Sequence, residues 1–253
     1  SFDEFLEFRK SSGEDIHKSF DAFLRFGGLP GLHELQASPR ATSQYLSDVF
    51  NSVLLKDVVS RNNIRDSERL NRIIQFIFDN VGSTFSAKNI SDFLKSQGRK
   101  LGVETIYNYL DYLENAFVIE RVKRFDLKGR KYLETQEKIY AADVGIRNSV
   151  LGYRPSDIAG ILENLVYLNL RQKGFSVSVG KTGTLEVDFV ASKDGAVFYV
   201  QVCYQLTPEN LEREIAPLRQ IKDNTLSDLM AGDVEGIKIR NLVDFLAEPI
   251  AKF

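Results

Sequence analysis

The chain has 253 residues, 43% of them hydrophobic and 27% charged, and a formal net charge of −2 at pH 7. These proportions are typical of globular domains and exclude a disordered or low-complexity chain. No run approaches the ~18 apolar residues of a membrane span, and the acidic N-terminal residues do not resemble a secretion signal. The single cysteine, Cys203, excludes an internal disulfide and a cysteine-rich zinc site. We therefore expect a cytoplasmic protein without a membrane partner.

Residues 1–65 are predicted to form a helical connector. The segment Arg25–Gly31 contains three glycines and a proline, which cannot continue a helix and therefore predict a turn. After this turn, apolar residues recur at helical spacing and predict a helix with one buried face: Tyr45, Leu46, Val49, Phe50, Val53, Leu54 and Val58.

Residues 66–150 are predicted to form three helices followed by a β-hairpin. Gly82 ends the first helix, and Ser86 has the chemistry of an N-cap for the second, which stops near Gly98. The apolar stripes of the first and third helices are Leu70, Ile73, Ile74, Ile77 and Phe78, and then Val103, Ile106, Tyr107, Leu110 and Leu113. One strand follows, with residues 117–119 and 122–125, and then a turn over 127–130 leads into another strand near Tyr132. This order is that of a winged helix, a helix-turn-helix variant.

The predicted hairpin is strongly basic. Six basic residues lie between Arg121 and Lys131, and only Asp126 opposes them. Such a run is either a solvated hairpin or a contact for nucleic-acid phosphates. The third helix carries a polar stripe opposite its apolar face, although Glu104, Asp111 and Glu114 on the same helix oppose phosphate approach. The candidate DNA-binding residues are Thr105, Asn108, Tyr112, Lys123, Arg124, Lys128, Arg130 and Lys131.

Residues 151–253 are predicted to form an α/β domain with a mixed sheet. A helix over 161–170 ends at Lys173-Gly174, and three strands follow over 175–179, 185–191 and 197–204. A Lys193-Asp194-Gly195 turn joins the last two strands, and Pro208 opens another helix. The fold class expected of the whole chain is therefore multidomain α+β.

Several fragments together resemble prokaryotic AAA-type ATPases in which a P-loop domain is followed by a conserved C-terminal region of unknown function. The order and spacing of these fragments cover nearly the whole chain. They are 1–8, 25–30, 54–57, 138–147, 163–168 and 186–189, with the sequences SFDEFLEF, RFGGLP, LLKD, KIYAADVGIR, ENLVYL and EVDF.

The resemblance has two departures. The family's phosphate-binding loop, G-x-x-x-x-G-K-[ST], is absent, and its nearest echo, Gly180-Lys181-Thr182, is predicted to be a turn between two strands. The resemblance therefore implies that ATP binds only to an ATPase domain that precedes Ser1, through which the protein would also form homo-oligomers. The second departure lies between Asn224 and Gly236, where the family has room for a further strand.

The last domain resembles the PD-(D/E)XK nuclease superfamily, in which an acid on the first helix, an acid on the second strand and an E-x-K pair on the third strand converge on Mg²⁺. The resemblance assigns these four catalytic positions to Glu163, Asp188, Gln201 and Cys203. Glu186 lies two residues before Asp188, on the same face of an extended strand. The weak metal-ligand set that follows is Glu163, Glu186 and Asp188.

Two of these positions lack the expected charge. Gln201 keeps a carbonyl oxygen but not the negative charge that draws Mg²⁺ out of its hydration shell, and the Cys203 thiol cannot become a cation. Lys181 is the best candidate for a displaced lysine. In the structural alternative, Cys203 fills core space and the acids are ordinary surface residues.

Three functions follow as hypotheses. The first is a regulatory or DNA-contacting arm of an ATPase, with an inactive nuclease-like domain. The second is an active Mg²⁺-dependent DNA nuclease, and the third is a protein-binding scaffold that uses the winged helix for assembly. Whether this chain is itself an enzyme is left open by the sequence, because the ATPase activity would belong to the parent protein.

Overall fold

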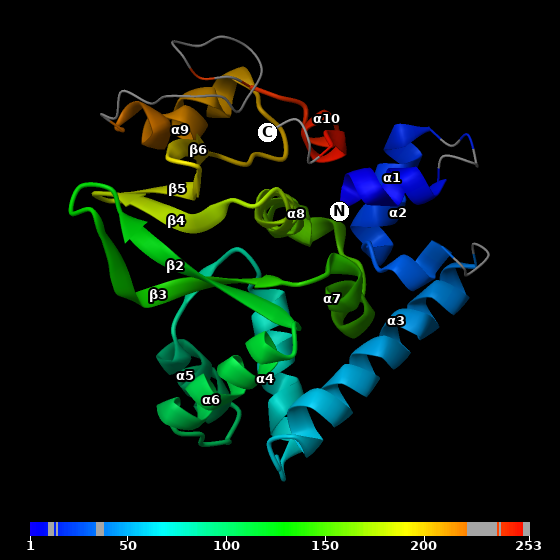
Figure 1. The fold of residues 1–253 in the computed structure, drawn as a ribbon. Coiled ribbons are helices and arrows are strands. Elements are labelled where there is room, and N and C mark those ends of the chain that lie inside the picture. Colours follow the sequence, from blue (N-terminus) through cyan, green and yellow to red (C-terminus); the bar gives the residue numbers. More distant parts are fainter. Residues whose placement is uncertain (10–12, 14, 34–37, 222–236, 238, 250–253) are drawn as a thin grey trace. The chain divides into compact units, whose positions relative to one another are not determined.

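The computed structural model describes residues 1–9, 13, 15–33, 38–221, 237 and 239–249 (Figure 1). The chain is α+β with a mixed sheet, and it divides into two compact units. The first unit comprises Ser1–Phe20, Val122–Thr135 and Pro155–Phe253, and the second comprises Asp21–Arg121 and Gln136–Arg154. Within the described ranges, no helix is both long and apolar enough to span a membrane.

The second unit is mainly helical. Its helices are α3 (Pro39–Val53), which continues as a π-helix (Leu54–Ser60), α4 (Ser67–Asp79), α5 (Ala87–Ser96), α6 (Val103–Asn115) and α7 (Val144–Leu151), and α2 (Ile16–Phe26) enters it from the first unit. The short strand β1 (Thr84–Phe85) pairs antiparallel with the second half of β3 (Lys131–Ala141). Strand β2 (Ile119–Asp126) begins in this unit, next to β3.

Side-chain N-caps and buried apolar faces account for these helices. The Ser86 hydroxyl accepts the N–H of Asn89 at 3.3 Å, as expected of an N-cap, and Asp66 caps α4 in the same way through the N–H of Arg69. The predicted stripe of α4 is confirmed, because every residue in the following set is at most 3% exposed: Leu70, Ile73, Ile74, Ile77 and Phe78.

Three apolar residues of this unit do not lie where the sequence pattern predicts. Val103 and Tyr107 on α6 are 40% and 41% exposed, so only the positions from Ile106 to Leu113 form the core face. Phe117 is 79% exposed and has a φ of +54°, which no strand adopts, so β2 begins at Ile119. These residues are apolar without being part of the core.

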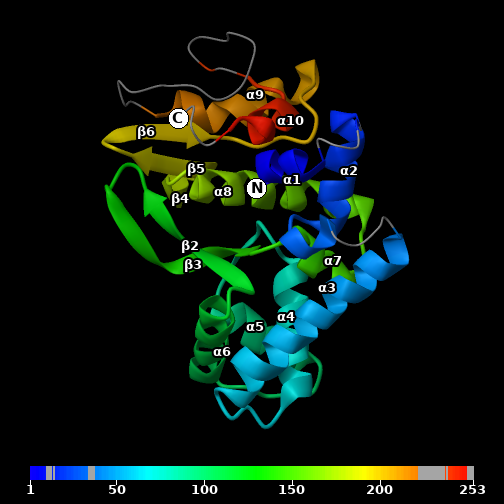
Figure 2. The same cartoon turned by 45° about the vertical axis from the view of Figure 1, so that its right-hand side comes forward.

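The first unit contains a sheet with a helix on each side (Figure 2). Its strands are β4 (Ser176–Thr182), β5 (Leu185–Lys193) and β6 (Ala196–Val200), which pair antiparallel in chain order, and β2 pairs with β4 in parallel. The helices are α1 (Phe2–Arg9), α8 (Ile158–Gln172), α9 (Pro208–Arg219) and α10 (Leu242–Ala247). A core of Val187, Val190, Tyr199, Ile215 and Leu218 joins the sheet to α9, while Phe189 stacks on Tyr167 of α8.

The predicted strand boundaries of this unit need two corrections. Strand β6 ends at Val200 and does not continue to Tyr204, so Gln201 and Cys203 follow the strand. Gly180-Lys181-Thr182 is not a turn but the end of β4, and the connection to β5 lies at 183–184. The turn at Asp194-Gly195 is confirmed, with both φ angles positive. The stretch from Asn224 to Gly236 lies outside the described residues.

Candidate functional site

Asp188 is the best-defined member of the expected nuclease-like site. Its side chain is 9% exposed on β5, and its Oδ2 accepts the N–H of Val202 at 2.8 Å. The N–H of Asp188 in turn donates to Oε1 of Gln201 at 3.3 Å. The structure thus brings Asp188 and Gln201 together, at the point where the chain leaves β6.

A β-bulge lies at Asp188. The register between β4 and β5 shifts from Ser178↔Val190 to Gly180↔Val187, so the stretch of β5 has one residue more than the stretch of β4 opposite it. Val187 and Val190 both face the core under α9 although they are three positions apart. A bulge redirects a side chain and is common beside active sites. The backbone is therefore irregular at the position of the expected acid.

Glu186 is surrounded by basic side chains. Nη2 of Arg124 on β2 lies 3.6 Å from Oε2 of Glu186. Lys181 on β4 lies directly opposite Glu186 on β5 and directly opposite Asp126 on β2, which forms a row of alternating charges across three strands. Lys181, the expected displaced lysine, therefore lies beside Glu186.

The three expected metal ligands do not form a metal-binding cluster. Glu163 is half-buried on α8, and Glu186 faces Arg124. In the part of the chain that the structure describes, no three histidine, cysteine, aspartate or glutamate side chains are grouped so that they could hold a metal ion. Within the described residues, Glu163, Glu186 and Asp188 are thus not grouped around a common point, and strand pairing gives Glu186 a cationic neighbour, Lys181.

Cys203 is half-buried, and its thiol donates a hydrogen bond to the carbonyl oxygen of Gln205 at 3.2 Å. Burial, and then the nearby Glu214, raises the pKa of this thiol above its ordinary value. A thiol with a raised pKa is neutral at pH 7. Cys203 therefore supplies neither a cation nor a ready nucleophile.

The α6 stripe is polar and reaches the surface. Asn108 is exposed, whereas Thr105 and Tyr112 are half-buried. Two acids that flank this stripe are paired with Arg121, the first residue of the basic run 121–131. Arg121 on β2 places Nη1 2.5 Å from Oδ1 of Asp111 and 3.7 Å from Oε2 of Glu114.

Arg121 is the centre of an ion-pair cluster. Its Nε also donates to Oε2 of Glu137 on β3 at 2.9 Å, and its side chain is only 16% exposed. Burial alone would lower the pKa of Arg121, but Glu137, Glu114 and Asp111 outweigh burial and raise it. The guanidinium remains charged and offsets part of the negative charge of Asp111, Glu114 and Glu137, whereas Glu104 of α6 is exposed. The sequence does show acids on α6 and β3 with an arginine on the strand between them. That these side chains come into contact, however, depends on the tertiary fold.

The hairpin cations differ in accessibility. Lys123, Lys128, Arg130 and Lys131 are exposed, whereas Arg124 is 7% exposed. Arg124 therefore departs from the expected DNA-facing set, because it lies inside the sheet against Glu186. All five residues belong to the first unit, whereas α6 belongs to the second.

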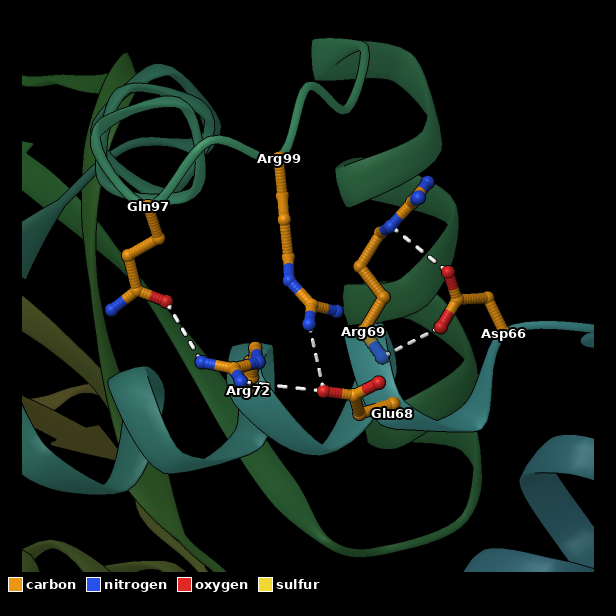
Figure 3. Close-up of polar contacts among 6 residues, drawn as sticks. All are labelled: Asp66, Glu68, Arg69, Arg72, Gln97 and Arg99. Carbon is orange, nitrogen blue, oxygen red and sulfur yellow. Dashed lines mark hydrogen bonds and ion pairs between the residues drawn. The ribbon is translucent and has the colours of Figure 1, made fainter.

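A surface network fixes the turn that precedes α6 (Figure 3). Oε1 of Glu68 on α4 accepts from Arg99 at 2.8 Å and from Arg72 at 3.3 Å, and Arg72 also donates to Oε1 of Gln97 at 3.1 Å. Gln97 and Arg99 flank Gly98, whose φ of +76° ends α5. The network ties the start of α4 to the turn between α5 and α6.

Comparison with known proteins places the chain in a family. A family model described as a domain of unknown function, DUF8612, matches residues 17–157. An uncharacterized protein of Haemophilus influenzae is 34% identical over 98% of this chain, and an uncharacterized protein of Methanocaldococcus jannaschii is 30% identical over 90% of it. The chain spans 63% and 54% of the lengths of these two relatives. No solved structure is significantly similar to the chain.

Proposed function

The chain belongs to the DUF8612 family, and we propose that it is the C-terminal arm of a longer AAA-type ATP-binding protein, which contacts duplex DNA through a winged-helix module and carries an inactive nuclease-like domain. The length of the relatives supports this proposal, because over a third of each lies outside the region that this chain covers. ATP would be bound by residues outside the chain, since its sequence contains no G-x-x-x-x-G-K-[ST] loop. Oligomers would form through the same ATPase domain.

The observation that carries the proposal is the order of elements from α4 to β3. The order is α4, β1, α5, α6, β2 and β3, and Thr84 of β1 is paired antiparallel with Lys138 of β3. A short strand between the first two helices that pairs with the last strand of a terminal hairpin is the winged-helix arrangement. In this arrangement, α6 is the helix that enters the major groove.

The charges around α6 support a DNA contact. Arg121 offsets one unit of the negative charge carried by Asp111, Glu114 and Glu137, which reduces the repulsion that Asp111 and Glu114 would exert on phosphates. Asn108 lies exposed on the polar stripe and can donate to or accept from base edges. Lys123 and Lys131 are exposed cations of the first unit and form a separate candidate contact for phosphates. We leave Arg124 out of this set because it is buried.

The order α8, β4, β5, β6 and α9 supports a nuclease-like domain, since it is the helix–three strands–helix order of the PD-(D/E)XK superfamily. Asp188 keeps the acid of the second strand and lies beside Gln201. The lysine position holds the neutral thiol of Cys203. A site that has lost one anionic ligand and its cation would bind Mg²⁺ weakly and stabilise a phosphoryl transition state poorly.

Salt-titrated fluorescence anisotropy with a dye-labelled duplex tests the DNA contact. We expect the double variant Thr105→Glu/Asn108→Glu to weaken binding about tenfold or more, because two anions would face the phosphates. The variant Lys123→Glu/Lys131→Glu should also weaken binding and should reduce the salt slope by about 2, roughly one for each lost phosphate contact.

The matched control for α6 is Asn71→Glu/Gln75→Glu, which adds the same charge to exposed positions of α4. This control should bind like the parent protein. If the two double variants on α4 and α6 reduce affinity equally, the effect is one of net charge, and α6 is not the contact. Unchanged affinity in the α6 variant would point instead to a protein-binding scaffold.

A further inference from the structure

The first unit contains a large open cavity that lies apart from the Asp188 site. Its volume is about 1140 Å³. The face of the sheet that packs against α9 forms its floor, and Ser178, Ser192 and Tyr199 are among the residues that line it. The turn between β2 and β3 forms one wall, and the C-terminal end of α9 forms another. None of the four expected nuclease positions lines this cavity.

The lining is cationic. Lys128 and Arg130 come from the β2–β3 turn, and Arg219 comes from the last turn of α9. None of the described lining side chains is a carboxylate, although acids and bases are nearly balanced in the whole chain. Arg219 is also paired with Glu212 of α9, so Lys128 and Arg130 contribute most of a local positive potential that the net charge of −2 conceals. The chemistry selects an anionic ligand with several acceptor oxygens.

The walls also present an aromatic ring for stacking. Tyr132 is 58% exposed, and its ring packs edge-on against Phe125, with the centroids 5.2 Å apart. Phe125 supports Tyr132 in this position, and both line the cavity with Lys128 and Arg130. An exposed, supported aromatic ring beside cations is the arrangement with which proteins bind unpaired bases and their phosphates.

We propose that this cavity binds a short stretch of single-stranded nucleic acid, with a base stacked on Tyr132 and the phosphates against Lys128, Arg130 and Arg219. The volume of about 1140 Å³ is slightly above the ~300–1,000 Å³ of usual small-molecule pockets, so the cavity has room for a segment of a polymer. In a duplex the bases are paired and stacked on one another, so they are not available to stack on Tyr132, and the cavity would favour single strands with exposed bases. This inference goes beyond the proposed duplex contact, since the cavity lies within the first unit and α6 within the second.

The test measures binding of the full chain to a dye-labelled oligothymidylate about a dozen nucleotides long, by anisotropy at several salt concentrations. Tyr132→Ala should weaken binding about fivefold or more, the loss of one stacked base. Arg219→Gln should weaken binding and lower the salt slope by about 0.7, the value for one phosphate contact on a single strand.

Each variant has a matched control in the same unit. Tyr204→Ala removes an equally exposed tyrosine that does not line the cavity, since Tyr204 is 65% exposed. Arg213→Gln removes another α9 arginine that, like Arg219, is paired with a glutamate of its own helix. Both controls should bind oligothymidylate like the parent protein. Equal losses in variant and control would overturn the inference.

Two further arms separate this inference from the proposed function. The α6 variant Thr105→Glu/Asn108→Glu should leave oligothymidylate binding unchanged, and Tyr132→Ala should leave duplex binding unchanged. If the α6 variant binds both the duplex and oligothymidylate more weakly while Tyr132→Ala binds both normally, the cavity inference is wrong and the proposed winged-helix contact still stands. If polyglutamate of equal charge displaces the strand as well as unlabelled oligothymidylate does, the cavity is a general polyanion site, and the inference is wrong.

Discussion

Asp143 and Gly28, 115 positions apart in the chain, are joined by a hydrogen bond within the second unit: Oδ2 of Asp143 accepts the N–H of Gly28 at 2.9 Å. Oδ1 of Asp143 accepts the N–H of Ile146 at 3.0 Å and so caps α7. A Cβ on Gly27, whose φ is +71°, would lie 2.2 Å from this carboxylate. Two of the fragments that carry the family resemblance are therefore parts of one structural contact.

We expect Asp143→Asn to lower the free energy of unfolding by about 1–3 kcal/mol. An asparagine can accept one of the two N–H groups through its oxygen, but its NH₂ group leaves the other, partly buried donor unpaired. Urea unfolding measures the loss. The control is Asp15→Asn, because Asp15 also accepts from two backbone N–H groups but is exposed. If Asp15→Asn lowers the free energy of unfolding as much as Asp143→Asn does, the position of Asp143 in the fold is not the cause of the destabilisation.

Arg121→Met should destabilise the protein by about 2 kcal/mol, between the values for exposed and buried ion pairs, because Arg121 is 16% exposed and compensates three acids. The variant should also weaken duplex binding, since Asp111 and Glu114 would then face the phosphates uncompensated. Arg213→Met, at an exposed pair with Glu214, should leave unfolding unchanged. Calorimetric unfolding and duplex anisotropy test the two effects separately.

Lys173 should make stability depend on pH in the alkaline range. It is buried at the end of α8, and its Nζ donates to the carbonyl oxygen of Phe245 at 3.2 Å. Burial lowers the pKa of Lys173 from 10.5 to about 8, while Asp3 opposes this shift and Arg240 adds to it. Between these two pKa values the unfolded chain binds more protons, so stability rises with pH across the window.

The measurement is the free energy of unfolding between pH 8 and 10, where we expect the parent protein to gain on the order of 2 kcal/mol from Lys173. Lys173→Met should abolish this gain. Lys95→Met, at an exposed position of α5, should retain it. An equally steep rise in the Lys173 variant would show that another group causes the dependence.

Plasmid nicking in Mg²⁺ and in Mn²⁺ should detect no cleavage by this chain. Loss of one preorganised electrostatic contact costs ~100-fold or more in rate, and here both Gln201 and Cys203 lack the required charge. Metal-dependent cleavage that disappears in Asp188→Ala would support the active-nuclease alternative, and Lys181→Ala would then test whether Lys181 replaces the missing cation. Activity gained by Gln201→Glu with Cys203→Lys would confirm the assigned positions.

Isothermal calorimetry should show no micromolar binding of MgATP to this chain. The end of β4 at Gly180-Lys181-Thr182 continues through a tight turn into β5, so no helix N–H groups follow it to hold a phosphate. Lys181→Ala should therefore leave the calorimetric trace unchanged. Heat of binding that this substitution removes would require a nucleotide site at the row of charges on β4.

The sequence by itself determined the features that depend on neighbours along the chain. The apolar stripe of α4, the N-cap at Ser86, the helix that opens at Pro208 and the turn at Asp194-Gly195 were all predicted correctly. Helix periodicity, capping and tight-turn conformations involve residues within about four positions of one another. They can therefore be derived from the sequence without knowledge of the fold.

Only the tertiary structure decided which side chains that are distant in sequence meet within each unit. The parallel pairing of β2 with β4 places Arg124 inside a sheet. The register shift at Asp188 makes β5 irregular, so the strict alternation of strand faces that the sequence pattern predicts for Glu186 and Asp188 does not continue through this position. Likewise, Arg121 meets acids from α6 and β3, and Tyr132 and Arg219 line one cavity. Burial and ion pairing depend on partners that are distant in sequence, and strand register, which local propensity does not specify, determines those partners.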